Sequence, residues 1–240
     1  THVETAGWLG RDDDLWLGGA AGSAGQVWIN GGAGSFTKMN AQALADDAGF
    51  EDMGGLWFDA DGNGTLDLYV VSGGSDFEPG DPELGDRLYL NKGGELSPAP
   101  DGAIPASRIS GGVVVGADFD RDGDVDLFVG GRQIPGAYPE AAQSALLING
   151  GGKFSDAGLE VKGLVTSALW SDANGDGWLD LLVTAEWGPV RVFQNKEGQL
   201  AEVTESTGIA GLTGWWNGIA GGDFDGRTLL GVGPHRDGAG

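Results

Sequence analysis

Short apolar runs separated by turn residues recur along the whole chain. Residues 67–72 (DLYVVS) and 180–184 (DLLVT) carry consecutive apolar residues, which is typical of strands that are buried on both faces. Other runs, such as residues 146–151 (LLINGG), end in asparagine and a glycine turn, a pattern that predicts β-hairpins. Residues 41–48 are the one segment expected to be helical, so the chain is predicted to be almost entirely β.

The runs repeat with a period of about fifty residues. An Asp-Leu pair opens an apolar strand at Asp14, Asp67, Asp126 and Asp180, with spacings of 53, 59 and 54 residues. A period in this range is typical of propellers and solenoids. Each repeat is interpreted as a strand, an acidic loop, a strand, a connection, a strand, an Asn-Gly turn and a last strand. Four antiparallel strands in this order match one propeller blade.

We therefore predict an all-β fold, a β-propeller of four-stranded antiparallel blades that forms a single domain over residues 1–240. The repeats are expected at about 10–53, 54–111, 112–163 and 164–214, with a partial repeat at 215–233. The favoured closure has about five blades, with the two terminal strands sharing one blade. A homodimer that completes an open array of blades is one alternative, and an ordinary β-sandwich is another.

Acidic residues alternate through residues 118–126 (DFDRDGDVD), with Gly123 at the turn. Five carboxylates this close repel one another unless a cation lies among them. Oxygen ligands on a flexible loop suit Ca²⁺, which accepts six to eight oxygens, backbone carbonyls included. An EF-hand loop closes with Glu at position 12 inside a helix, whereas this loop closes with an acid at position 9 that opens a strand. The pattern predicts a calcium loop between two β-strands.

Two further loops, residues 59–67 and 172–180, match this one position for position. We expect side-chain oxygens from positions 1, 3, 5 and 9 as ligands, together with the backbone carbonyl of position 7. These residue types also suit hairpin turns, but three copies in one register favour calcium. The predicted ligands of about three Ca²⁺ sites are Asp59, Asp61, Asn63, Thr65, Asp67, Asp118, Asp120, Asp122, Asp124, Asp126, Asp172, Asn174, Asp176, Trp178 and Asp180.

The acidic loops at the two ends of the chain are incomplete. Asp223 and Asp225 begin a loop in the last repeat, but the later ligand positions are missing, so both are weaker metal candidates. The first repeat offers only residues 10–14 (GRDDD) before its strand, which is too short for a full loop. Metal binding is therefore expected in the three central loops.

The charge of the chain narrows the range of partners. The formal net charge is −23, which argues against nucleic acid and anionic membrane surfaces as partners. Eleven of the 36 acidic residues lie in the three full loops, three in the first, five in the second and three in the third, where bound calcium would offset part of the charge. The chain has no cysteine, which excludes disulfides and thiol chemistry, and no apolar run long enough to insert into a membrane.

Two long connections, residues 75–87 and 131–140, join the second strand of a repeat to the third. They should project from one end of the propeller, and function on such scaffolds usually lies in loops. Aromatic residues beside charged ones suit stacking on sugar rings with hydrogen bonds to hydroxyls. The candidate ligand-binding residues at this end are Arg132, Tyr138, Glu186, Trp187, Trp215 and Trp216. Core packing between blades is the expected role of Trp28, Trp57 and Trp170.

The D-x-D-x-D-G-x-x-D-L loops, with Asn-Gly hairpins in step, resemble the FG-GAP/VCBS repeats of integrin-α-like calcium-binding β-propellers. Residues 86–91 (DRLYLN), 127–132 (LFVGGR), 138–140 (YPE) and 185–187 (AEW) are similar to bacterial secreted VCBS-repeat proteins. The resemblance covers about residues 10–225 and implies calcium ligands in the three full loops. It also implies an extracellular or cell-surface location. Such propellers commonly have six to eight blades, more than the four clear repeats here.

Two functions are consistent with these features. The first is a calcium-stabilised binding or adhesion module for carbohydrate or protein ligands. The alternative is a calcium-dependent hydrolase or lyase acting on phosphoesters or acidic polysaccharide. Only two histidines are present, His2 and His235, both near an end, so a histidine-based triad is excluded and no catalytic residue is assigned. Calcium activates bound water less than zinc does, and the binding module is favoured.

Overall fold

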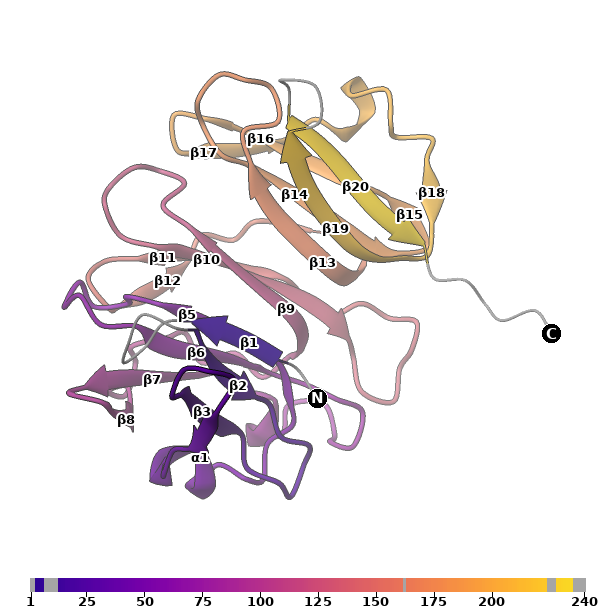
Figure 1. Cartoon of the computed structure of the whole chain (residues 1–240). Helices are drawn as coiled ribbons and strands as arrows, with labels where there is room; N and C mark the ends of the chain where they lie inside the picture. The colour runs from indigo at the N-terminus through magenta and orange to yellow at the C-terminus, as the bar shows by residue number, and fades with distance from the viewer. Residues whose placement is uncertain (1–2, 7–12, 162, 224–227, 235–240) are drawn as a thin grey trace.

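A computed structural model of the chain describes residues 3–6, 13–161, 163–223 and 228–234, with side chains described for 13–161 and 163–222. Four antiparallel sheets of four strands follow one another along this part of the chain, and a two-stranded hairpin follows the fourth sheet (Figure 1). The prediction of an all-β fold built from propeller blades is confirmed.

Each four-stranded sheet contains one of the four Asp-Leu pairs, and we number the sheets as blades one to four. Blade one comprises β1 (Val3–Ala6), β2 (Asp14–Leu17), β3 (Gln26–Asn30) and β4 (Phe36–Lys38). Blade two comprises β5 (Asp52–Phe58), β6 (Asp67–Ser72), β7 (Arg87–Lys92) and β8 (Glu95–Pro98). Blade three comprises β9 (Ser110–Ala117), β10 (Asp126–Gln133), β11 (Ala145–Asn149) and β12 (Phe154–Asp156). Blade four comprises β13 (Leu164–Ser171), β14 (Asp180–Glu186), β16 (Arg191–Lys196) and β17 (Gln199–Glu202).

The remaining elements are short or lie at the C-terminal end. The last hairpin pairs β19 (Trp216–Asp223) with β20 (Thr228–Pro234), and a small ladder pairs β15 (Gly188–Pro189) with β18 (Thr213–Gly214). The helix α1 (Gln42–Asp46) lies within the predicted helical segment, and two 3₁₀ turns are η1 (Pro82–Leu84) and η2 (Thr204–Ser206). None of the helices in the described part of the chain is long and apolar enough to span a membrane.

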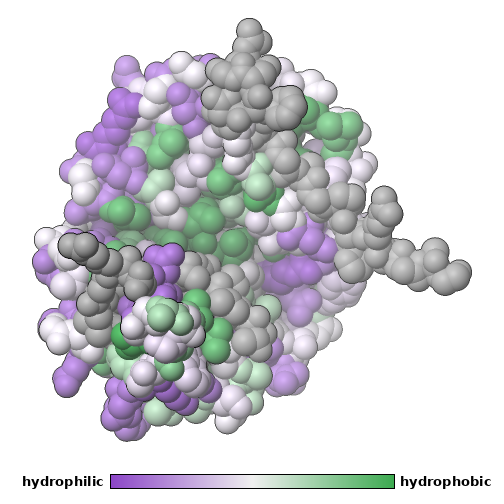
Figure 2. Space-filling model, viewed as in Figure 1, coloured by the Kyte–Doolittle hydropathy of each residue, from purple (hydrophilic) through white to green (hydrophobic). Residues whose placement is uncertain are grey.

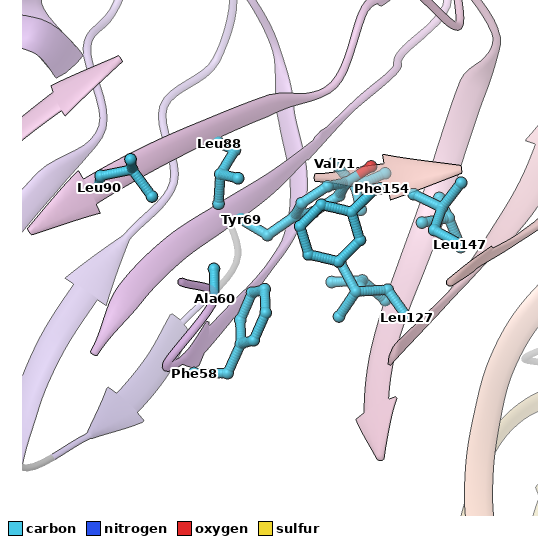
Figure 3. Packing of buried hydrophobic residues seen from close by; sticks show 11 residues of the cluster. Phe58, Ala60, Tyr69, Val71, Leu88, Leu90, Leu127, Leu147 and Phe154 are labelled. Atoms are coloured by element: carbon cyan, nitrogen blue, oxygen red, sulfur yellow. The ribbon is translucent and has the colours of Figure 1, made fainter. Parts of the chain in front are cut away.

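Successive blades pack face to face because the second strand of each blade is apolar on both sides. On β6, Leu68 and Val70 pack with Trp16 of blade one, whereas Tyr69 and Val71 pack with Leu127 and neighbouring residues of blade three. Figure 3 shows this second cluster, in which side chains from blades two and three meet. A third cluster joins blades three and four. In this way the alternation along one strand fills two different inter-blade cores.

The first strands of the sheets lie side by side, β1 with β5, β5 with β9, β9 with β13 and β13 with β19. Figure 2 shows the molecule from the same side as Figure 1. Hydrophobic residues gather near the middle of the view, between blade one and blade four, and hydrophilic residues lie toward the outside. The two terminal strands were expected to share one blade, and in this respect the prediction is wrong. β1 completes blade one by pairing with β2, whereas β20 pairs with β19 in a separate sheet.

Acidic loops between blades and an aromatic surface

The ninth residue of each acidic loop is a buried aspartate that binds the hairpin of its own blade. Asp126 is fully buried, and its Oδ1 accepts a hydrogen bond of 2.9 Å from the backbone N–H of Asn149. The same bond joins Asp67 to Asn91 (2.7 Å), Asp180 to Asn195 (2.8 Å) and Asp14 to Asn30 (2.7 Å). Blade one keeps this aspartate although its loop is too short for a full metal site. The Asp-Leu and Asn-Gly patterns seen in the sequence are therefore two halves of one contact.

The third and fifth positions of each full loop shape the turn. In the loop of residues 118–126, Asp120 Oδ1 accepts from the N–H of Asp122 (3.2 Å), and Asp122 Oδ1 accepts from the N–H of Asp124 (2.9 Å). Asp61 and Asn63 make the equivalent bonds in the first full loop, as do Asn174 and Asp176 in the third. In each case the backbone N–H donates to the side-chain oxygen of the residue two positions earlier, which forms an Asx turn.

Carboxylate oxygens converge in two of the three loops. Ligand atoms of Asp59, Asp61 and Asp67 all lie within 4.8 Å of one another, and so do those of Asp118, Asp120 and Asp126. These residues occupy positions 1, 3 and 9 of their loops, three of the five positions predicted to supply ligands. In the second cluster, Oδ1 of Asp118 and Oδ2 of Asp126 are buried and have no hydrogen-bond partner among the described residues. Such oxygens need a cation or a proton, so the donor set fits a hard divalent cation.

The pKa values of the buried loop carboxyls reflect the same unfavourable crowding. Burial, followed by the charges of Asp120, Asp122 and Asp118, raises the pKa of Asp126 to about 7. Burial also raises the pKa of Asp67 and of Asp180, with smaller contributions from neighbouring carboxylates of the same loops. A cation among these groups would favour the charged forms and lower each pKa.

The third loop has an asparagine, Asn174, at position 3, where the other two loops have an aspartate. Asp172 accepts hydrogen bonds from three loop N–H groups, with Oδ1 bound to Gly175 and Asp176 and Oδ2 bound to Gly177. The amide of Asn174 donates to Asp176 Oδ2 at 2.9 Å. Because position 3 is an asparagine, positions 1, 3 and 9 of this loop supply two carboxylates, Asp172 and Asp180, and no cluster of three acids is found here among the described residues. The weaker candidate Asp225 lies outside the described residues, and so does the side chain of Asp223.

An asparagine amide links each of the first two full loops to the following blade. The side-chain amide of Asn149, in blade three, donates to the carbonyl of Ala60 at 3.0 Å, and that of Asn195, in blade four, donates to the carbonyl of Phe119 at 2.8 Å. Ala60 and Phe119 occupy the second position of the loop in the preceding blade. We call these two contacts the asparagine latches. The latches could not be predicted from the sequence, because nothing local in the sequence marks which carbonyl the amide reaches.

Other contacts of the second full loop also cross to blade four. Arg121 has a φ of 65° and donates to the carbonyl of Gly177, and its guanidinium lies 3.9 Å from the ring centre of Trp178. The loop also lies against Gly198, where an added Cβ would come within 3.0 Å of Asp120 Cβ. The second and third loops are therefore in direct contact through Arg121.

The six candidate ligand-binding residues lie in one connected group, which we call the aromatic surface. It comprises Arg132, Tyr138, Glu186, Trp187, Trp215 and Trp216. The buried carboxylate of Glu186 accepts from Arg132 Nη2 through Oε1 and from the Tyr138 hydroxyl through Oε2, the latter at 3.0 Å. Trp187 Nε1 donates to the Tyr138 hydroxyl at 3.3 Å. Residues from blades three and four are thus joined around one carboxylate.

The three tryptophans of the aromatic surface have different environments. The ring centres of Trp187 and Trp215 are 4.8 Å apart with an interplanar angle of 39°. Trp187 is 63% exposed, whereas Trp216 is half-buried and donates from Nε1 to the carbonyl of Gly188 at 3.0 Å. We assign Trp216 a supporting role, because it holds the turn that follows Trp187.

The tryptophans expected in the core are buried or partly buried. Trp57 is 8% exposed within the cluster between blades one and two. Trp170 stacks on Phe119 with ring centres 5.3 Å apart, and its N–H donates to the carbonyl of Val115. Trp28 is partly buried on β3.

Comparison with known protein families finds a match to the FG-GAP-like repeat over residues 172–228. The chain carries an FG-GAP-like repeat. The matched segment begins at the third acidic loop and runs through β14–β19. This FG-GAP-like repeat therefore contains the last three strands of blade four and the first strand of the hairpin that follows. The resemblance seen in the sequence is confirmed for this segment. No curated protein gives a significant match to the chain.

Among solved structures, a lectin from Agrocybe aegerita, described by its recognition of non-reducing terminal N-acetylglucosamine, aligns with a TM-score of 0.49 and 20% identity. The alignment covers 79% of this chain and 47% of the lectin, so the chain spans about half the length of that protein.

Proposed function

We propose that this chain is a calcium-binding β-propeller that acts as an extracellular or cell-surface binding module. The observation that carries the proposal is the convergence of three carboxylates in each of two loops, where one oxygen each of Asp118 and Asp126 is buried and finds no hydrogen-bond partner in the described part of the chain. Crowded hard oxygen donors are the donor set that Ca²⁺ prefers.

Two sites have their ligand residues assembled. Asp59, Asp61 and Asp67 would hold one ion, and Asp118, Asp120 and Asp126 would hold the other. Within each loop, Asn63 or Asp122 at position 5 and the backbone carbonyl of Thr65 or Asp124 at position 7 remain the proposed additional ligands. A third ion is proposed for the loop of Asp172, Asn174, Asp176, Trp178 and Asp180.

Bound calcium has a structural role in this proposal. It offsets the repulsion between carboxylates, and the asparagine latches connect the first two loops to the next blade, so an ordered loop stabilises an inter-blade contact. The blades then present the aromatic surface as the ligand-binding region. The binding module is preferred to a hydrolase or lyase because both oxygens of the one buried carboxylate there, Glu186, are already hydrogen-bonded.

A thermal melt tests the proposal directly. We expect a large rise in Tm in millimolar calcium relative to EGTA, because a ligand that binds only the folded state stabilises it. Magnesium at the same concentration serves as the control and should give a smaller rise, because Mg²⁺ requires near-octahedral geometry. Light scattering on the same samples separates a monomer from a homodimer that completes the array of blades. An unchanged Tm in calcium would leave the acidic loops as ordinary turns and refute the proposal.

A further inference from the structure

The aromatic surface exposes large rings that the fold does not bury. Tyr138 is 53% exposed and Trp187 is 63% exposed, and they are two of the four large hydrophobic residues that are exposed in the described part of the chain. Tyr138 comes from the connection between β10 and β11, and Trp187 follows directly after β14. Two different blades therefore contribute adjacent exposed rings.

The exposed rings are held in fixed positions. Trp187 has a φ of 61°, a left-handed conformation that is a genuine outlier for a bulky residue. Such strain persists only where surrounding contacts enforce it, and it concentrates at functional sites. The enforcing contacts here are the hydrogen bond to the Tyr138 hydroxyl, the packing of Trp215, and the pairing of Gly188 in β15 with Gly214 in β18. The chain thus maintains an energetically unfavourable backbone conformation that keeps an indole ring exposed.

Polar groups suited to hydroxyl recognition border the rings. The Arg132 side chain is 29% exposed, and a guanidinium has five N–H donors, more than its contacts with Glu186 and the carbonyl of Leu164 use. The Tyr138 hydroxyl donates to Glu186 and accepts from Trp187, which leaves its oxygen able to accept one further hydrogen bond from a ligand hydroxyl. An apolar ring face beside such donors matches a pyranose, which has an apolar C–H face and a rim of hydroxyls.

The charge of the surface selects among saccharides. Arg132 neutralises Glu186 in a salt bridge, so the aromatic surface carries little net charge of its own. The chain as a whole has a formal net charge of −23, which repels polyanions such as uronate-rich or sulfated polysaccharides. A protein partner would need an interface of about 800 Å² on each side, far more than three rings provide. A neutral saccharide fits both the charge and the size.

We propose that Trp187, Trp215 and Tyr138 form a platform for the pyranose ring of a neutral saccharide, with Arg132 and the Tyr138 hydroxyl contacting its hydroxyl groups. Glu186 is a positioning residue that orients Arg132 and Tyr138. This inference rests on the proposed function as a binding module and names the ligand class.

The first experiment probes a glycan array with the calcium-loaded protein. The array contains neutral gluco-, galacto-, manno- and N-acetylhexosamine oligosaccharides beside uronate-containing and sulfated ones, and the strongest ligand is then titrated by tryptophan fluorescence. We expect neutral glycans to bind and to quench the emission of exposed Trp187. Binding only to the acidic glycans, or to none, would overturn the proposal.

Variants locate the site. Trp187→Ala should weaken binding of the selected glycan at least about tenfold, because it removes the most exposed ring. The matched control is Phe36→Ala, which removes an aromatic ring that is 40% exposed on β4 of blade one and should leave the affinity unchanged. Glu186→Gln should weaken binding less than Trp187→Ala and change the preference among hydroxyl epimers, because it loosens Arg132. Equal affinities for Trp187→Ala and the wild type would place the glycan elsewhere and refute this assignment.

The two proposals can fail separately. Calcium-dependent melts of the wild type and of Trp187→Ala are recorded with the binding data. A normal calcium-dependent rise in Tm without neutral glycan binding would reject the saccharide platform and leave the calcium module standing. Glycan binding that is retained in EGTA without any effect of calcium on Tm would reject the calcium module and leave the platform standing.

Discussion

The asparagine latch between blades three and four can be removed by one substitution. The amide of Asn195 donates to the carbonyl of Phe119 in the preceding blade (2.8 Å) and to that of Leu179 in its own blade (3.0 Å), and its Oδ1 accepts from the N–H of Gly198. Asn195→Ala removes all three bonds from a site that is fully buried. Its backbone N–H keeps the bond to Asp180.

The matched control is Asn30→Ala in blade one. The side-chain oxygen of Asn30 accepts from the N–H of Gly32, two residues on instead of three, and its amide donates to the carbonyl of Asp13 in its own blade. Among the described residues it has no bond to another blade. Asn30 is only partly buried, whereas Asn195 is fully buried, so the difference between the two variants measures the latch together with the greater burial of Asn195.

The expected magnitudes follow from counting bonds. Each hydrogen bond contributes about 1 kcal/mol net, and a buried acceptor that loses its partner costs about 1–3 kcal/mol more. Asn30→Ala, which loses two bonds, should then lower the free energy of unfolding by about 2 kcal/mol, and Asn195→Ala, which loses three bonds and leaves a buried acceptor unpaired, by about 4–6 kcal/mol. Phe119 is 2% exposed and belongs to the second full loop, so its carbonyl is counted as a buried acceptor that would lose its partner.

Urea unfolding in calcium and in EGTA measures both quantities. Asn195→Ala should also reduce the stabilisation by calcium, because it disconnects the second full loop from blade four, whereas Asn30→Ala should leave that stabilisation intact. Equal losses for the two variants, in both buffers, would show that the latch adds nothing beyond its turn.

Three further predictions concern the carboxylates. Asp122→Ala should lower the Tm in calcium and change it little in EGTA, and thermal melts that show equal losses in both would exclude Asp122 as a ligand. Because burial and neighbouring charges raise the pKa of Asp126 to about 7, above its unfolded value, the cation-free protein should lose stability as pH rises from 4 to 7. Calcium favours the charged carboxylates, so the calcium-dependent rise in Tm should grow from pH 5 to pH 8, and a rise that is constant with pH would contradict this. Asp86 accepts from Ser72 N–H and the Tyr69 hydroxyl, and burial raises its pKa to about 6. The charged form therefore costs stability above pH 6, and Asp86→Asn should gain about 2 kcal/mol relative to the wild type between pH 4.5 and pH 8 in urea melts, whereas a pH-independent difference would refute the assignment.

The fold was predictable because its determinants are local and repeated. The Asp-Leu pairs at Asp67, Asp126 and Asp180 mark the first residues of β6, β10 and β14. The Asn-Gly turns mark the point where the third strand of each blade ends. The apolar runs predicted strands buried on both faces, as β6 and β14 are. The sharing of a blade by the two terminal strands was predicted wrongly, because pairing between segments two hundred residues apart leaves no mark in local patterns.

The candidate sites were predictable as residue types but not as contacts. The acidic loops follow from their alternating aspartates, whereas the loop N–H groups that each carboxylate reaches, such as the three bound to Asp172, could not be predicted. The six residues of the aromatic surface could be named from charged and aromatic positions in loops. That Arg132 and Tyr138 share the carboxylate of Glu186 depends on how blades three and four pack, which no single repeat encodes.

The asparagine latches all run from a later blade to an earlier one, and this has a consequence for how a repeat protein gains or loses blades in evolution. Each donor belongs to the later blade and each acceptor to the earlier one: Asn149 donates to Ala60, and Asn195 donates to Phe119. Ala60 and Phe119 occupy the same loop position, and Asn149 and Asn195 the same turn position. A deletion of one whole repeat could start within the loop of Asp59 and end at the equivalent position of the loop of Asp118. The two loops would then be joined into one, and Asn195 would contact this joined loop in the way that Asn149 now contacts the loop of Asp59. Unequal recombination in register would thus add or delete a blade while regenerating the same joint, whereas a crossover out of register would leave a donor without its acceptor.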